Sequence, residues 1–171
     1  DLGSNAVLRI ILNGALTGPG TDGLVINAAN TIVRGLVINQ FPGDGIEIRG
    51  SDVSGVKIEG NFIGTDVTGT VFTGLVNGQN GIFIAAAGNL VGSVDLAGRN
   101  IIAGNLRGVL IDGPGATGNR VYNTVLRNNS LEGVRISSSN NTIGRDTTNG
   151  DNRIFKNGQG VVVSGPSARN N

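Results

Sequence analysis

The stretch Gly45-Ile46-Glu47-Ile48 states the pattern that decides the fold: a glycine, an aliphatic residue, a residue of any type and a second aliphatic residue. The same phrase returns at 23–26, 81–84, 108–111, 133–136 and 160–163. Its first aliphatic residue stands at 24, 46, 82, 109, 134 and 161, in steps of 22 to 36 residues. Repetition at this spacing indicates one structural unit stacked along an axis.

Two further strand-like pieces follow each phrase before it returns. After Ile48, for example, come Val56-Lys57-Ile58 and Asn61-Phe62-Ile63. Alternation places Ile46 and Ile48 inward and Glu47 outward. Gly, Asn, Asp, Ser and Thr separate the pieces, and these residues accept turn conformations readily. The pattern predicts an all-β fold: a right-handed parallel β-helix of about six coils, each with three short strands, roughly 30 Å long.

Asparagines recur at the expected corners of this solenoid. Asn30, Asn89, Asn119 and Asn141 each stand two residues before an aliphatic residue that we expect to point inward. Stacked asparagines can form ladders of side-chain amides along the axis. We therefore predict a structural role for them rather than a catalytic one.

The composition limits the chemistry available to the chain. Its 171 residues suffice for a single domain, which we place at 1–171, and 30 of them are glycine. It contains no cysteine and no histidine, which excludes disulfides, thiolate metal sites and imidazole catalysis within the chain. No run of about 18 apolar residues is present, so we expect no membrane span.

Charge is unevenly distributed along the chain, although the net charge is only +1. Residues 1–98 carry 4 basic and 8 acidic side chains, whereas residues 99–171 carry 9 basic and 4 acidic ones. In a rod built coil by coil, this split makes one end acidic and the other basic. An acidic end that meets a basic end forms a head-to-tail contact, which does not close and so propagates.

Three stretches break the period and are predicted to form insertion loops: 65–80, 93–98 and 145–151. Binding residues of repeat proteins often lie on such insertions. The alternative explanation is that these loops have lengthened without a binding role, because the solenoid tolerates insertions there.

The phrases Ala6-Val7-Leu8-Arg9-Ile10, Val33-Arg34-Gly35-Leu36-Val37-Ile38-Asn39 and Gly60-Asn61-Phe62-Ile63-Gly64-Thr65-Asp66 resemble the repeats of large bacterial surface and secreted proteins. Those repeats form right-handed parallel β-helices of the pectin-lyase-like superfamily in its broad sense. The resemblance implies an extracellular or cell-surface location. It covers polysaccharide lyases, glycoside hydrolases, epimerases, adhesins and phage tailspikes, and the fold alone does not choose among them.

The catalytic motifs of polygalacturonase-like hydrolases in this superfamily are missing, since the chain has no histidine and no Asp-Asp pair. We therefore lean away from an enzyme and predict no catalytic residues and no cofactor. Asp22 and Asp44, one coil apart, are weak candidates for binding a metal ion such as calcium. A variable surface column at a turn is the simpler explanation of this pair.

The outward position of the repeated phrase is a candidate interaction face. Four of its six residues are apolar where solvent is expected, which is typical of a protein contact or of a face covered by an insertion loop. The six residues are Val25, Glu47, Phe83, Leu110, Arg135 and Val162.

No sequence that would form a helical cap is recognisable at either end, so we expect the end coils to be covered by further coils of a longer rod or by another subunit. The leading prediction is a structural, surface-exposed β-helix module that self-associates by head-to-tail stacking of coils, as a filament or an adhesin-like rod. The alternative is a polysaccharide-binding or lyase-like domain with a glycan partner. Nucleic acid is not an expected partner, because the basic residues are interspersed with carboxylates.

Overall fold

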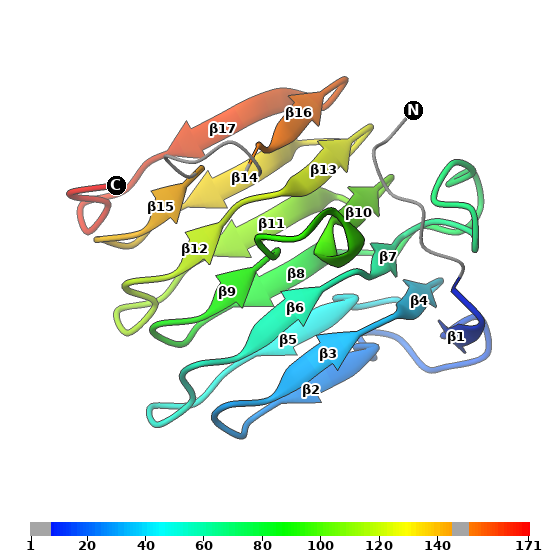
Figure 1. Ribbon diagram of the computed structural model, residues 1–171, viewed down its shortest axis with the longest axis horizontal. Helices are drawn as coiled ribbons and strands as arrows, with labels where there is room; N and C mark the ends of the chain where they lie inside the picture. The colour runs from blue at the N-terminus through cyan, green and yellow to red at the C-terminus, as the bar shows by residue number, and fades with distance from the viewer. Residues whose placement is uncertain (1–7, 145–150) are drawn as a thin grey trace.

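A computed structural model describes residues 8–144 and 151–171, and it shows a parallel β-solenoid (Figure 1). Three sheets run along the solenoid, and every strand pair within them is parallel. Successive strands of the chain visit sheet A, sheet B and sheet C in turn. The prediction of an all-β fold with about six coils of three strands is thereby confirmed.

Sheet A has six strands: β1 (Ile10–Asn13), β4 (Leu36–Asn39), β7 (Phe62–Ile63), β10 (Asn100–Ala103), β13 (Thr124–Arg127) and β16 (Arg153–Phe155). Sheet B also has six: β2 (Leu24–Ile26), β5 (Ile46–Ile48), β8 (Asn80–Ile84), β11 (Arg107–Ile111), β14 (Glu132–Ile136) and β17 (Gln159–Val163). Sheet C has five: β3 (Ile32–Arg34), β6 (Lys57–Glu59), β9 (Leu90–Val91), β12 (Arg120–Val121) and β15 (Thr142–Ile143). Within the described residues a single 3-10 turn, Leu96–Gly98, is the only helical element, and no helix there is long and apolar enough to cross a membrane.

The repeated phrase forms sheet B in the predicted register. Ile46 pairs with Ile82, Ile82 with Val109 and Val109 with Val134, so the first aliphatic position makes one continuous column. The second aliphatic position does the same through Ile48, Ile84, Ile111 and Ile136. These side chains are fully buried and, with inward residues of sheets A and C, form the main core.

The glycine that opens each of the first five phrases is required by lack of space, whereas Gly160 of the last phrase has no atom closer than 4.0 Å to its Cβ position. A Cβ atom on Gly45 would lie 2.7 Å from the carbonyl oxygen of Gly81 and 2.8 Å from Cγ2 of Ile63. On Gly133 it would lie 2.7 Å from Cγ2 of Ile154 and 2.8 Å from the oxygen of Gly160. At each of these two glycines, the corner between sheets A and B therefore packs so closely against the next coil that no side chain fits.

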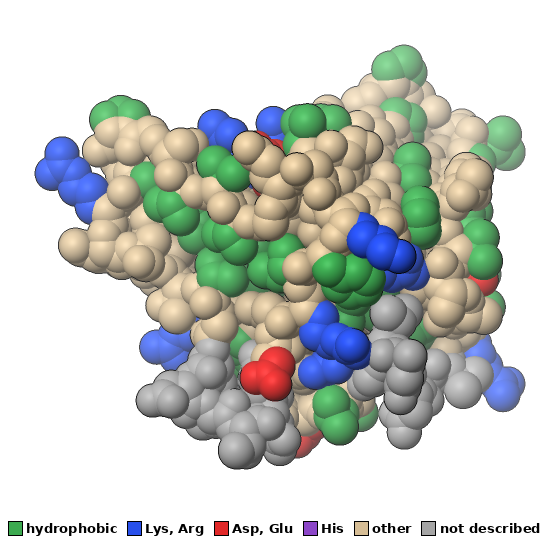
Figure 2. Space-filling view, turned by 90° about the horizontal axis from the view of Figure 1, so that it is seen from above, with side chains coloured by type: hydrophobic (Ala, Val, Ile, Leu, Met, Phe, Trp, Pro, Cys, Tyr) green, Lys and Arg blue, Asp and Glu red, His purple; other side chains and the backbone are tan. Residues whose placement is uncertain are grey.

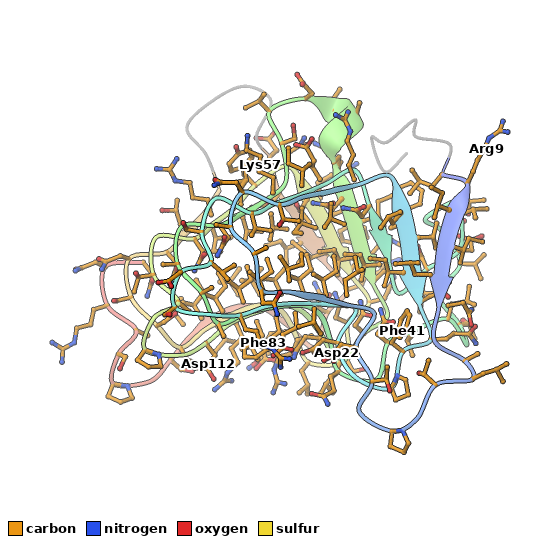
Figure 3. The ribbon with its side chains drawn as sticks, turned by 90° about the horizontal axis from the view of Figure 1, so that it is seen from below. Arg9, Asp22, Phe41, Lys57, Phe83 and Asp112 are labelled. Atoms are coloured by element: carbon orange, nitrogen blue, oxygen red, sulfur yellow. The ribbon has the colours of Figure 1, made fainter. Side chains whose placement is uncertain are left out.

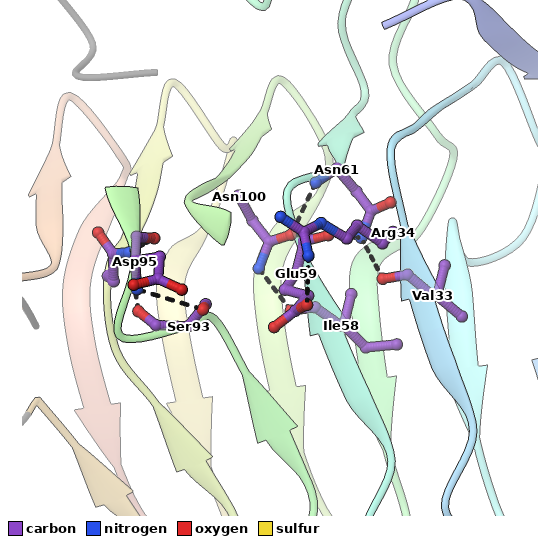
Figure 4. Close-up of polar contacts among 9 residues, drawn as sticks. Val33, Arg34, Ile58, Glu59, Asn61, Ser93, Asp95 and Asn100 are labelled. Atoms are coloured by element: carbon purple, nitrogen blue, oxygen red, sulfur yellow. Dashed lines mark hydrogen bonds and ion pairs between the residues drawn. The ribbon is translucent and has the colours of Figure 1, made fainter. Parts of the chain in front are cut away.

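Asparagine ladders line all three corners of the solenoid. Between sheets B and C, Oδ1 of Asn119 accepts from the backbone N–H of Asn89 at 2.8 Å, and Oδ1 of Asn141 accepts from that of Asn119 at 2.9 Å. Between sheets C and A, Asn100 accepts from the backbone of Asn61 at 3.0 Å, as the close-up shows (Figure 4). A third ladder, between sheets A and B, runs through Asn77, Asn105, Asn129 and Asn157.

The predicted ladder position of Asn30 is wrong by one residue. Ile32 pairs with Lys57 and Lys57 with Leu90, so Thr31 rather than Asn30 stands in the column of Asn89. Asn30 adopts a left-handed backbone (φ 57°) instead. Ile32, which the prediction pointed inward, is 60% exposed, and Val33 fills the core at 7%.

Candidate interaction face

Three columns of side chains cover the outside of sheet B, and together we call them the sheet B face. The middle column is the predicted set, and its members pair in register from Val25 to Val162. The first column lies at the entry to each strand and comprises Asp22, Asp44, Asn80, Arg107, Glu132 and Gln159. The third column lies at the exit and comprises Asn27, Arg49, Ala85, Asp112, Ser137 and Ser164.

The middle column is accessible along its whole length. Val25 is 41% exposed, and the other five members are partly buried. Seen along the solenoid axis, Phe83 lies on the same side of the molecule as Asp22 and Asp112, away from the packed interior (Figure 3). The structure therefore brings all six predicted residues together on one side. Whether they bind a partner stays a prediction.

Ion pairs fix the charged side chains of the sheet B face. Glu47 pairs with Arg49 at 2.9 Å within the second coil. Glu132 pairs with Arg107 at 2.7 Å and with Arg135 at 2.9 Å, which links two coils. Burial of Glu132 raises its pKa, but the hydrogen bond from Arg135 and the charge of Arg107 outweigh burial, so the pKa lies below the ordinary value.

Asp22 and Asp44, the weak metal candidates, lie in adjacent coils. Each of their carboxylates accepts hydrogen bonds from the next residue of the first column. Oδ1 of Asp22 accepts from the backbone N–H of Asp44 at 2.7 Å. Oδ1 of Asp44 accepts from the backbone and the side-chain amide of Asn80, both at 2.8 Å. Burial is the main cause of a raised pKa of Asp44, and the nearby charges of Asp22 and Glu47 add to it.

Calcium binding by this pair stays untested. Calcium prefers six to eight oxygen ligands. Across residues 8–144 and 151–171, no group of three or more histidine, cysteine, aspartate or glutamate side chains is arranged to hold a metal ion.

The insertion 65–80 covers the outside of sheet A rather than the sheet B face. A buried cluster of Leu8, Val37, Phe62, Ile101 and Val125 lies on that outer side. A Cβ atom on Gly69 would lie 2.7 Å from Cδ1 of Ile101, so the loop packs directly on this cluster. The end of the predicted loop already belongs to the solenoid, because Asn77 is a ladder residue and Asn80 begins β8.

Arg127 anchors this loop and is a residue that the sequence did not single out. It lies on β13, is 7% exposed, and donates to the backbone oxygens of Gly69 at 2.8 Å and Thr70 at 3.0 Å. Its guanidinium also stands 5.4 Å from the centre of the Phe72 ring. Inside the loop, the Asp66 carboxylate accepts from the backbone N–H groups of Thr68, Thr70 and Val71. The loop is therefore a packed element with its carboxylate already engaged.

Of the other two predicted insertions, 93–98 lies wholly within the described residues and 145–151 lies within them only at Asp151. Residues 93–98 contain the 3-10 turn, and their backbone oxygens at Ser93 and Asp95 accept from the side-chain amide of Asn123, both at 2.8 Å. Of the stretch 145–151, residues 145–150 lie outside the described residues.

The last coil exposes the solenoid interior. Val161 and Val163, which continue the two buried aliphatic columns of sheet B, are 45% and 49% exposed, whereas Val134 and Ile136 one coil earlier are 0% exposed. Figure 2 looks onto this end and shows hydrophobic side chains gathered in the middle of the face. A hollow of about 700 Å³ opens here, lined by Arg99, Ile143, Gly144, Asp151, Asn152, Arg153, Ile154 and Val161.

Comparison of the chain with protein-family models, with curated proteins and with solved structures finds no match. The class that the fold defines is therefore the parallel β-solenoid, and its function is argued from the surfaces described above.

Proposed function

We propose that this chain is a structural, non-enzymatic solenoid module whose copies stack end to end. The observation that carries the proposal is the open last coil, where Val161 and Val163 of the aliphatic columns stand half exposed. A further coil placed on them, from a second copy or from flanking coils of the same polypeptide, would bury these side chains as Val134 and Ile136 are buried. It would also supply partners for the open edge of β17, as β17 does for β14.

The first coil of a second copy supplies suitable side chains for this contact. Continuing sheet B in register sets Val161 beside Leu24 of the second copy and Val163 beside its Ile26. In sheet A the same operation sets Ile154 beside Leu12. Apolar residues therefore meet apolar residues at these three positions, and Leu12 and Leu24 are themselves only partly buried.

Charge favours the head-to-tail direction of stacking. The half of the chain that holds the first coils is acidic and the half that holds the last coils is basic. The two coils in contact carry little of this difference, because residues 8–35 hold only Arg9, Asp22 and Arg34, and residues 151–171 hold Asp151, Arg153, Lys156 and Arg169. The attraction therefore acts between the acidic and basic halves of neighbouring copies, and the contact repeats without closing. The product is a filament about one solenoid wide.

The cellular setting of the proposal rests on the resemblance to bacterial surface and secreted β-helices. On that basis we place the module outside the cell or at the cell surface, as a filament or as a segment of an adhesin-like rod. The second candidate, a polysaccharide-binding or lyase-like domain, rests on the same resemblance and would be tested by glycan screening.

The test is the particle size of the purified chain by negative-stain microscopy and light scattering. We expect filaments at high concentration and low salt, and shorter particles as salt screens the charges. A Val161→Asp/Val163→Asp variant should remain short, because it sets carboxylates in the contact; a Val71→Asp variant, on the exposed insertion loop, should still form filaments. Compact particles of the unaltered chain under all conditions would refute end-to-end stacking.

A further inference from the structure

Five Asn-Gly pairs stand in the sequence, and they differ in their place along the solenoid. Asn13-Gly14 lies in the first coil and Asn157-Gly158 in the last. Asn77-Gly78 and Asn80-Gly81 lie in the third coil, with a coil on either side. The fifth pair, at 149–150, lies outside the described residues. Of the described pairs, two therefore lie at the ends of the solenoid and two in its interior.

Asparagine is chemically labile, and most so before glycine, whose backbone lacks a Cβ and can turn its nitrogen toward the preceding side chain. The glycine nitrogen attacks the side-chain carbonyl carbon of the asparagine. A carbon–nitrogen bond forms, the side-chain nitrogen leaves as ammonia with the proton of the attacking N–H, and a succinimide ring remains. Water opens this ring at either carbonyl, which yields aspartate or isoaspartate. Water is the only co-reactant, so no enzyme is needed.

Asn77 and Asn157 are rungs of the same ladder and differ in what lies beyond them. Each accepts a hydrogen bond through Oδ1 from a backbone N–H of the preceding coil, at 3.1 Å and 3.0 Å. On its other side Asn77 is held by Asn105, whose Oδ1 accepts from its backbone N–H and its side-chain amide, both at 3.1 Å. In the described part of the chain no coil follows Asn157. Asn77 is accordingly 1% exposed, whereas Asn157 is only partly buried.

Hydrogen bonds restrain the glycine nitrogens in the folded chain. Each of these N–H groups donates to a backbone oxygen of a neighbouring coil, at 2.7 Å for Gly78, 3.1 Å for Gly158 and 2.9 Å for Gly14. The reaction therefore requires local opening of the coil. Opening at Gly78 disrupts contacts with the coils on both sides, whereas opening at either end of the solenoid disrupts contacts with one coil only.

We propose that Asn13 and Asn157 are sites of spontaneous deamidation, and that conversion there weakens the stacking of one copy on the next. The second half of this proposal rests on the end-to-end stacking proposed above. Continuing sheet A in register from the last coil of one copy sets Phe155 beside Asn13 of the second copy. Asn157 follows Phe155 by two residues, so both labile pairs lie at the same corner of one junction.

Conversion of Asn157 disturbs the last coil in two ways. Its Nδ2 donates to the backbone oxygen of Leu126 at 2.9 Å, and a carboxylate has no hydrogen to donate there. Isoaspartate also adds a carbon atom to the main chain within the corner 156–158, between β16 and β17. A lengthened corner displaces Val161 and Val163 of β17, the side chains that a second copy would cover. Neither effect depends on charge, so the neighbouring Lys156 does not cancel them.

Stacking in turn protects these sites. A second copy on the last coil would place Asn157 between two coils, as Asn77 is placed within the chain. Asparagines at free ends therefore convert faster than those inside a filament. Deamidation is irreversible, so it acts as a slow stop to growth at the ends that have stayed free.

The first test follows conversion of the full chain, site by site, by peptide mass spectrometry during incubation at mildly alkaline pH. Each conversion adds the mass of water and removes that of ammonia. In dilute solution we expect the two end pairs to convert at least about tenfold faster than the two interior pairs, because fewer contacts must break. In urea the four pairs should convert at similar rates, since the fold no longer distinguishes them.

The second test measures filament formation by the converted chain. Conversion adds a negative charge, so ion exchange separates converted from unconverted chains. We expect conversion at Asn157 to raise the concentration needed for filaments at least about tenfold, and Asn157→Asp to raise it in the same direction. Asn170→Asp adds the same charge to an exposed residue of the last coil and is the matched control, which should leave that concentration unchanged. Thermal unfolding checks that each chain remains folded.

Equal conversion of end and interior pairs in the folded chain would overturn the proposal, as would a difference that persists in urea. Filaments of the converted chain that match those of the unconverted chain would overturn its second half. An unaltered chain that forms no filaments refutes end-to-end stacking and that second half together. The rates measured in dilute solution decide the deamidation sites in either case, because they do not depend on assembly.

Discussion

Asp44 holds a structural position in the first column of the sheet B face, but its charge lowers the stability of the folded protein. Its carboxylate accepts two hydrogen bonds from Asn80, the same role that an asparagine oxygen plays at other corners. These hydrogen bonds favour the ionised carboxylate, but they do not outweigh its burial. Burial, together with the charges of Asp22 and Glu47, disfavours the ionised form and raises the pKa.

Replacing Asp44 by asparagine should therefore stabilise the protein at neutral pH. A raised pKa in the folded state means that ionisation opposes folding at pH values above the folded pKa. That penalty disappears as the pH falls below the ordinary value of 3.8. We expect Asp44→Asn to raise the melting temperature by about 2–4 °C at pH 7 and to give no gain near pH 3.

Thermal unfolding of the variant and the unaltered chain at both pH values measures this difference. Asp52→Asn is the control, since Asp52 is exposed at a turn and should give no comparable gain at pH 7. An equal effect of Asp44→Asn at the two pH values would show that the carboxylate charge is not the cause.

At the scale of the element, the corners rather than the strands specify the coil. The strands are two to five residues long, too short to fix their own register. The glycine of each of the first five phrases lets the next coil approach, and the asparagine ladder beside it ties the backbone of successive coils together. Both features repeat with the coil and hold each aliphatic column in line.

A side chain at one of these glycines should be costly. In Gly45→Ala the new Cβ would meet the Gly81 oxygen and the Ile63 side chain below 3.0 Å, so backbone must shift. We expect a loss of about 1–3 kcal/mol in the free energy of unfolding, measured by urea denaturation. Gly18→Ala is the matched control, because nothing lies within 4 Å of its Cβ position. Equal losses in the two variants would show that crowding at the corner is not the reason for the glycine.

The sequence allowed the strands of sheet B to be predicted because their inward positions are aliphatic in every coil. The slip at Asn30 arose because Ile32 and Val33 are both β-branched, so alternation alone did not show which of them faces the core. The third ladder was missed although it left a signal: Asn77, Asn105, Asn129 and Asn157 each stand three or four residues before the glycine of a phrase.

The candidate face was predictable as a column but not as a surface. Alternation identified Val25 through Val162 as outward, since that inference needs only local strand geometry. The position of insertion 65–80 was not predictable, because it depends on contacts of Arg127 with Gly69 and Thr70, which are 58 and 57 residues away in the chain.

At the scale of the whole molecule, stability should vary along the solenoid axis, because each coil contacts only its neighbours. The central strands β8 and β11 are covered on both sides, and their inward residues Ile82, Ile84, Val109 and Ile111 are fully buried. The last strand of sheet B, β17, has a neighbour on one side and keeps Val161 and Val163 about half exposed. Local opening should therefore begin at β16 and β17 and reach the centre last.

Amide hydrogen exchange tests this gradient and connects it to assembly. In dilute solution we expect the amides of β17 to exchange at least about tenfold faster than those of β11, since fewer contacts must break to expose them. Raising the protein concentration should slow exchange in β17 if a second copy covers the last coil, while β11 stays unchanged. In the Val161→Asp/Val163→Asp variant the concentration dependence should vanish. Uniform exchange along the solenoid would mean that it unfolds as one cooperative unit; a gradient insensitive to concentration would mean that β17 has no partner in a second copy.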